Sequence, residues 1–474
     1  MIFYQSRFFA YPSGAPFLHT LNSASAPSYT LVTTDRSVSL LTYGEAGYRL
    51  HKLKMNVPQS EEPHLVASAA MELSTTHEAR IAVAYAIGEA YYLQVFVPPY
   101  EHLDHAGAVE ASSGANFELD AAPTCMFDMQ AVGTNGNVFY GVIVCCADAM
   151  LAIGYIVNGN NENPSIDADT SWTRLRTDQF AAFFPEFATF AHTVVAVDRV
   201  MSPEKDQGWV ALGCTDGLVR VFHGQHHGGL LTGPFRTKDL QLNGVVTSVA
   251  LYVKRAASED AKRTWRCNLL VTCAIGQALV YEDLFGPVNH IGNGEVLVGS
   301  DHFDSIFTGV VADVDLDGHV ELVLGTDAQV VLAYKERRED ESQPTSILED
   351  ATRAVLDPVP ESVAASANEI SPLSTGSARN IWEDLETIAA IDERVARAPE
   401  PSLARWKWQR LSKRQWNVQA FGAIYSLLWR DINHDGVPEF LVASATGVYV
   451  YEADAVVVLK KIESVLSALT TSRT

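Results

Sequence analysis

The chain has 474 residues, 47% of them apolar and 19% charged, a composition that suits a folded globular protein and excludes a chain disordered throughout. Its formal net charge of −23, with no dense cluster of Lys and Arg, disfavours nucleic acid and anionic lipid headgroups as partners. Gln5 and Arg7 interrupt the N-terminal stretch that a signal peptide would need, and no run approaches the roughly 20 apolar residues of a membrane span, so we expect a soluble, cytosolic protein.

One pattern recurs along the chain: a short apolar run, a small polar turn and a second apolar run, as in a β-hairpin. The seven instances lie at 29–43, 80–97, 138–157, 209–222, 268–281, 320–334 and 439–451. Most begin about 50 to 70 residues apart, which leaves room for four strands in each unit. The pattern predicts an all-β fold, a seven-bladed β-propeller. It disfavours two or three β-sandwiches, which would show no single period from end to end.

Apolar runs before the hairpins predict the innermost strands, and more polar runs after them predict outer edges that face water. The expected inner strands include 65–70, 194–197, 245–251, 306–311 and 424–429, and the expected outer strands include 49–53, 172–175 and 406–411. The last hairpin is followed by apolar residues at helical spacing, so its blade lacks an outer strand. We expect the unassigned run at 2–9 to supply this strand and close the ring.

These assignments divide the chain into four parts. The expected parts are blades one to six in 1–335, a disordered acidic insertion in 336–401, the end of blade six with blade seven in 402–452, and a short C-terminal helix in 453–474. The insertion is rich in Glu, Ser, Pro and Ala, and disorder is the expectation for such a composition. Within it, Trp382, Leu385 and Ile388 predict a short helix at 380–397 that either docks to a partner or packs on this propeller.

Cysteines and catalytic motifs give no sign of an enzyme. The six cysteines lie mostly in apolar runs without Cys-x-x-Cys spacing, so we expect reduced, structural thiols. The histidines of 223–228 suggest an exposed loop in preference to a zinc site, because no strand or helix is expected to fix them. Asp301, His302 and Asp304 are expected in an entry loop of blade six. No phosphate-binding loop, nucleophile elbow or His-Glu-x-x-His helix occurs.

Two aligned acidic loops give the sharpest local signal. Oxygen-bearing side chains stand at positions one, three, five and nine of each loop, with glycine at position six for a sharp turn. They are Asp313, Asp315, Asp317 and Glu321 in the first loop, and Asp431, Asn433, Asp435 and Glu439 in the second. Such oxygens could hold a structural Ca²⁺, whereas Asp and Asn could equally bond neighbouring backbone N–H groups without an ion. Apolar strands follow both loops, which disfavours an EF-hand.

These loops resemble the FG-GAP repeats of integrin-α-type propellers. The order and spacing of 280–284, 299–305 and the loop at Asp313 resemble the kaptin family more specifically. Weaker similarity covers 184–187, 211–221, and 408 through the loop at Asp431, whereas the insertion after Lys335 departs from the family. The resemblance therefore spans more than half of the chain, towards its C-terminus.

The resemblance implies a subunit of the KICSTOR complex, which brings the GATOR inhibitor of Rag GTPase signalling to the lysosomal surface and makes the TOR kinase responsive to nutrients. It also implies another FG-GAP propeller as a partner and a link to actin. The residues alone indicate a soluble, acidic propeller. The missing signal sequence, the unpaired cysteines and the lack of catalytic motifs, together with the resemblance, favour an intracellular, non-enzymatic scaffold without a cofactor. The alternatives are an extracellular Ca²⁺-dependent adhesion propeller, supported by the acidic loops, and a propeller enzyme such as a glycosidase with paired carboxylates.

Overall fold

The structure is a computed structural model that describes most of the chain outside several connections and one long segment. The described residues are 3–10, 17–21, 29–55, 62–72, 79–97, 112–133, 136–147, 149–157, 172–227, 230–255, 265–286, 294–338, 406–412, 416 and 418–471. The chain divides into two units, one made of 1–335 with 410–474 and the other of 336–409. The predicted helix at 380–397 and the predicted disorder of the insertion lie outside the described residues.

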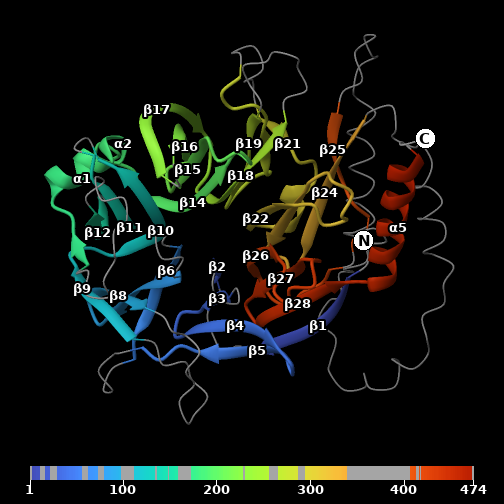
Figure 1. Cartoon of the computed structure of the whole chain (residues 1–474), viewed down its shortest axis with the longest axis horizontal. Helices are drawn as coiled ribbons and strands as arrows, with labels where there is room; N and C mark the ends of the chain where they lie inside the picture. The colour runs from blue at the N-terminus through green and yellow to red at the C-terminus, as the bar shows by residue number, and fades with distance from the viewer. Residues whose placement is uncertain are drawn as a thin grey trace, which may run out of the picture. The chain divides into compact units, whose positions relative to one another are not determined.

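Successive four-stranded blades form a seven-bladed β-propeller (Figure 1). Blade one contains β2 (Phe17–Leu21), β3 (Tyr29–Thr33), β4 (Val38–Gly44) and β5 (Gly47–Lys52). Blade two contains β6 (His64–Glu72), β7 (Ala79–Ile87), β8 (Ala90–Val97) and β9 (Ser112–Leu119). Blade three contains β10 (Pro123–Val132), β11 (Val138–Cys146), β12 (Met150–Val157) and β13 (Thr173–Arg174). Blades four and five contain β14 (Val194–Met201), β15 (Gln207–Cys214), β16 (Leu218–His227), β17 (Leu230–Gln241); and β18 (Val246–Arg255), β19 (Trp265–Cys273), β20 (Leu279–Tyr281), β21 (Glu295–Val296). A single bridge between Ala131 and Leu231 joins blades three and four into one sheet.

Blades six and seven complete the ring. They contain β22 (Ile306–Ala312), β23 (Glu321–Thr326), β24 (Val331–Arg338), β25 (Trp406–Arg410); and β26 (Ile424–Arg430), β27 (Glu439–Ser444), β28 (Gly447–Ala453), β1 (Phe3–Ala10). The N-terminal strand β1 runs antiparallel to β28, with a register from Phe3 opposite Ala453 to Ala10 opposite Gly447. The seventh blade is therefore built from both ends of the chain.

The core lies between neighbouring blades, because each sheet packs its faces against the sheets on both sides. Every residue of β23 and of β27 is buried, as expected for a strand covered on both faces. Leu31 and Val38 of blade one pack in one cluster with Ile81 of blade two. Leu18 of blade one packs with Leu441 of blade seven, so the apolar contacts continue around the ring.

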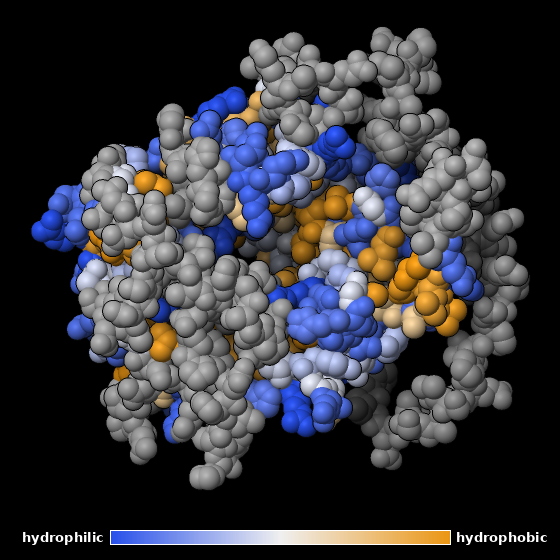
Figure 2. All heavy atoms as spheres, in the orientation of Figure 1, coloured by the Kyte–Doolittle hydropathy of each residue, from blue (hydrophilic) through white to orange (hydrophobic). Residues whose placement is uncertain are grey.

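Four described helical segments accompany the strands. The helices α1 (Thr177–Phe183) and α2 (Pro185–Ala188) bury phenylalanines against blades three and four, and a 3-10 helix (Ser300–Phe303) precedes β22. The helix α5 (Ala455–Thr471) buries Val458 in the core near β1 and leaves Val456, Leu459 and Ile462 exposed. Figure 2 shows hydrophobic residues gathered over α5. Among the described helices, none has the combination of length and apolar character that crossing a membrane requires.

The predicted fold class is confirmed, with all seven hairpins present as the second and third strands of the blades and with a short C-terminal helix. The expectation of an exposed loop at 223–228 is wrong for 223–227, which form the end of β16. His223 belongs to β16, where it pairs with Trp209 on one side and with Arg236 on the other. Its ring stacks on that of Trp209 at 5.0 Å. Cross-strand pairing overrides the polar composition of this run.

Candidate functional site

The two acidic loops connect the first and second strands of blades six and seven, and they share one backbone conformation. The fourth residue of each loop has a positive φ, 57° at Leu316 and 61° at His434. The sixth is a glycine with a φ of 87° in both loops, Gly318 and Gly436. Glycine takes this left-handed region without a steric penalty, so the aligned sequences produce aligned turns.

The first residue of each loop bonds the backbone of the same turn. Asp313 accepts hydrogen bonds from the N–H groups of Asp317 at 2.9 Å and Gly318 at 2.8 Å. Asp431 accepts one from the N–H of Gly436 at 3.0 Å. Together with the Asx-turn bonds that Asp317 and Asp435 accept from the backbone two residues on, these bonds can hold such a loop without an ion.

The ninth residue of each loop points inward and closes it. Glu321 is 0% exposed and accepts a bond from the Val314 N–H at 3.0 Å. Glu439 is 1% exposed and accepts a bond from the Ile432 N–H at 2.6 Å. Both carboxylates therefore anchor the start of their own loop, and their remaining oxygens need a further partner in a buried setting.

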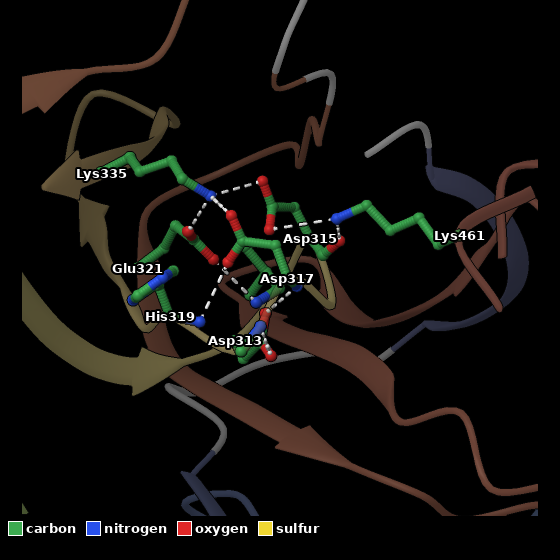
Figure 3. A network of polar contacts seen from close by, with 9 residues as sticks. Asp313, Asp315, Asp317, His319, Glu321, Lys335 and Lys461 are labelled. Carbon is green, nitrogen blue, oxygen red and sulfur yellow. Dashed lines mark hydrogen bonds and ion pairs between the residues drawn. The ribbon is translucent and has the colours of Figure 1, made fainter. Parts of the chain in front are cut away.

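In blade six that partner is an ammonium group (Figure 3). The Nζ of Lys335 lies 2.7 Å from Asp315, 2.5 Å from Asp317 and 2.9 Å from Glu321. Burial lowers the pKa of Lys335, but hydrogen bonds to these three carboxylates outweigh burial and hold the pKa above its usual range. Lys461 of α5 also reaches Asp315, 3.4 Å from Nζ to Oδ1. The blade-six loop thus already contains a permanent cation.

In blade seven an acidic residue stands at the position that Lys335 has in blade six. Because Glu321 lies opposite Lys335 and Phe440 lies opposite Tyr451, the position opposite Glu439 is Glu452. The hydroxyl of Tyr48, from blade one, donates to Glu439 at 3.0 Å. Burial raises the pKa of Glu439 to about 7, against the lowering effect of its bonds to Ile432 and Tyr48. Glu452 accepts hydrogen bonds from Tyr4 and, at 2.8 Å, from Ser6.

The structure brings together three of the four predicted oxygen ligands in each loop. Asp313, Asp315 and Asp317 each offer one carboxylate oxygen within 4.8 Å of the others, and so do Asp431, Asp435 and Glu439. Of the remaining predicted residues, Glu321 turns to Lys335, and Asn433 bonds the side chain of Asp435 at 3.0 Å. In blade seven, Oδ1 of Asp431 is buried with no hydrogen-bond partner among the described residues. An oxygen set of this kind is suited to a hard cation.

Sequence reasoning missed four side chains around these loops: Lys335, Lys461, Tyr48 and Glu452. Lys335 and Glu452 could have been found from hairpin register, since each lies across the strand pair from the last loop residue. Tyr48 and Lys461 could not, because they come from other elements of the propeller.

The cysteines lie apart from this site. All six are free and most are buried. Burial raises the pKa of the Cys214 thiol to about 12, so this thiol remains protonated at neutral pH.

Comparisons with known proteins match part of this chain to a protein family. Residues 145–361 match the family model described as KICSTOR complex protein kaptin. The mouse (Mus musculus) KICSTOR complex protein kaptin is 35% identical over 157 residues, which are 32% of this chain and 35% of the mouse protein. The chain thus aligns with about a third of the length of this curated relative.

Among solved structures, crystal structures of BBS1N in complex with ARL6DN, soaked with lead or with mercury, cover 96% of this chain and 97% of theirs at 9% identity and a TM-score of 0.45. The family match extends 26 residues beyond Lys335, so the segment that follows β24 does not depart from the family at its start, and it stops before the loop at Asp431. Through residues 145–361, which reach from the end of β11 to beyond β24, this chain is similar to the kaptin family, and the predicted resemblance to kaptin is confirmed.

Proposed function

We propose that this chain is a non-enzymatic scaffold subunit of a KICSTOR-like complex, which recruits the GATOR inhibitor to lysosomal membranes in nutrient-dependent TOR signalling. The observation that carries the proposal is the match of residues 145–361 to the kaptin family model. A rigid ring of sheets with broad loop-lined faces suits large protein interfaces better than a deep reactive pocket.

The partners in this proposal are proteins. Another FG-GAP propeller subunit is the first, and GATOR and actin filaments are further ones. The chain would be cytoplasmic and would reach the lysosomal surface through the assembled complex. Its net charge of −23 supports partners other than nucleic acid or anionic lipid.

Any cation bound by the acidic loops would be structural in this proposal. Both loops lie between strands and close on their own backbone, so an ion there would stiffen a blade. The blade-seven loop is the better candidate, because Lys335 occupies the corresponding place in blade six.

Affinity purification from the native cells tests the scaffold proposal. We expect the tagged protein to retain at least one partner at fixed stoichiometry through a salt wash, and its depletion to weaken the response of TOR signalling to nutrient withdrawal. Recovery as a free monomer, together with unchanged signalling after depletion, would contradict the proposal.

A further inference from the structure

The hairpin turns and the connections between blades meet at one end of the strands. One backbone hydrogen bond recurs there in consecutive blades: Thr215 N–H to Thr193 O, Ala274 N–H to Val245 O, Asp327 N–H to Ser305 O, and Ala445 N–H to Ala423 O. In each case the turn after the second strand bonds the residue that leads into the first strand. This end of blade six is opposite the acidic loop, because β22 starts at Ile306 and ends at Ala312, just before Asp313.

Hydrogen bonds between blades join these turns into a continuous rim over blades five to seven. The Ser305 hydroxyl donates to Ala274 O at 2.8 Å, which ties blade six to the blade-five turn. Gly422 N–H donates to Oε1 of Gln329 at 3.1 Å, which ties blade seven to the blade-six turn. The turns are therefore held in fixed relative positions without help from a partner.

Three large apolar side chains are exposed along this rim. Ile275 is 84% exposed, Phe421 is 69% exposed and Val245 is 44% exposed. Val245 and Ile275 are neighbours through the bond from Ala274 to Val245. Single exposed apolar residues need no explanation, but several at the tips of adjacent, mutually braced turns are typical of a protein-binding surface.

The charge on the same rim is negative. Asp301, Asp304 and Asp327 are exposed, and Asp301 accepts a hydrogen bond from Gln277 in the Ile275 turn at 3.1 Å. The five segments that form the rim, 242–245, 274–277, 299–305, 326–329 and 419–423, contain no Lys or Arg. His302 lies 4.0 Å from Asp301, and the guanidinium of Arg410 lies over the Phe303 ring at one edge. The apolar tips are thus surrounded mainly by carboxylates.

We propose that this rim, made of Val245, Ile275, Asp301, Asp304, Asp327 and Phe421, binds a basic segment of a protein partner that also carries apolar side chains. The apolar side chains of the partner would cover Ile275 and Phe421, and its Lys or Arg side chains would face the three aspartates. Complementary charge would steer association, and burial of the two large apolar tips would supply most of the affinity. The inference rests on the proposed scaffold function and assigns a surface to it.

Carbodiimide cross-linking of the purified native complex tests this assignment. Carbodiimide joins carboxylates directly to amines in contact with them, so we expect cross-links from Asp301, Asp304 or Asp327 to lysines of a partner subunit. In parallel, full-length variants carrying Ile275→Ser with Phe421→Ser, or all three aspartates changed to Asn, are purified under the same salt wash. We expect partner yield to fall roughly ten-fold or more with the apolar pair, since buried apolar anchors dominate binding energy. With the Asn variant we expect a smaller loss that grows as salt is lowered.

The Leu459→Ser variant is the matched control, because it removes an apolar side chain of α5, 59% exposed, that lies outside the rim. All of these positions are exposed, so melting temperatures should stay near that of the native protein. A partner retained at native yield by the rim variants, without cross-links at the three aspartates, would overturn the inference and leave the scaffold function standing. Absence of any stoichiometric partner would contradict both.

Discussion

Blades six and seven carry the same acidic loop on the same backbone, yet they are completed in different ways. In blade six, Lys335 of the third strand forms ion pairs with the carboxylates of the loop. Blade seven places Glu452 at that position and relies on the hydroxyl groups of Tyr48, Tyr4 and Ser6, which come from blade one and from β1. Blade six therefore holds a cation from its own hairpin, with Lys461 of α5 as a second one, whereas blade seven relies on hydroxyl groups from distant parts of the chain.

The difference shows that a loop motif does not fix its own electrostatics. Both loops have the acidic residues and the glycine that predict a cation site, but the residue across the hairpin decides whether that site already contains a positive charge. Perturbing each blade separately should therefore give effects of different size.

Deletion of residues 1–10 should have the largest effect. It removes β1, exposes the edge of β28, and takes Tyr4 and Ser6 away from Glu452. An unpaired strand edge with exposed apolar neighbours promotes aggregation. We expect the truncated chain to be insoluble or to melt far below the native protein. A soluble monomer with an unchanged melting temperature would show that blade seven does not need the N-terminus.

Lys335→Met should have the second largest effect on stability. It leaves Glu321 buried with one backbone N–H as partner and leaves Asp315 and Asp317 to repel it. Removing one partner from a buried ion pair typically costs 3–5 kcal/mol, and the partial exposure of this cluster reduces the expected loss to about 2–4 kcal/mol. Chemical denaturation measures this loss in the free energy of unfolding. Lys461→Met, which affects only Asp315, is the matched control and should cost less than about 1 kcal/mol. Equal losses in the two variants would remove the special position of Lys335.

Glu321→Gln and Glu439→Gln should change stability by different amounts near pH 8. Burial raises the pKa of Glu321 to about 7 as well, so at pH 8 this carboxylate is ionised and paired with Lys335. In the first variant, its replacement by Gln weakens that ion pair and should destabilise the fold by about 1–3 kcal/mol. The second removes a buried acid whose pKa is raised from 4.5 to about 7. A raised carboxyl pKa adds stability below pH 4.5 that is lost as pH rises through 7, with an upper limit of about 3 kcal/mol. Glu439→Gln should therefore flatten the fall of stability between pH 5 and pH 8 and cost nothing at pH 8. A native slope retained in this variant would contradict the assignment.

The sequence predicted the propeller well because its signal is local and repeated. Each hairpin shows its own alternation of apolar runs and turns, and the inner strands precede them at regular intervals. The helices α1 and α2 escaped prediction because they are short and are stabilised by phenylalanines packed against strands of blades three and four.

The candidate site was predicted only in part. The loop residues are contiguous, so their pattern could be read directly. The bond from Tyr48 to Glu439 joins residues 391 positions apart, and it exists only because the ring closes. Lys461 reaches Asp315 from α5 across 146 positions. Such contacts depend on tertiary structure and leave no local signal in the sequence.

The central claim is that the residue across the hairpin decides whether an acidic loop is open to a cation. Calcium titration calorimetry on three full-length proteins tests it most directly, after melting curves confirm that each is folded. The account predicts one bound Ca²⁺ in the native protein, two in Lys335→Met and none in Glu452→Lys, with thermal stabilisation of about 1.4 kcal/mol for a site at ten times its dissociation constant. The same stoichiometry in all three proteins would contradict the claim.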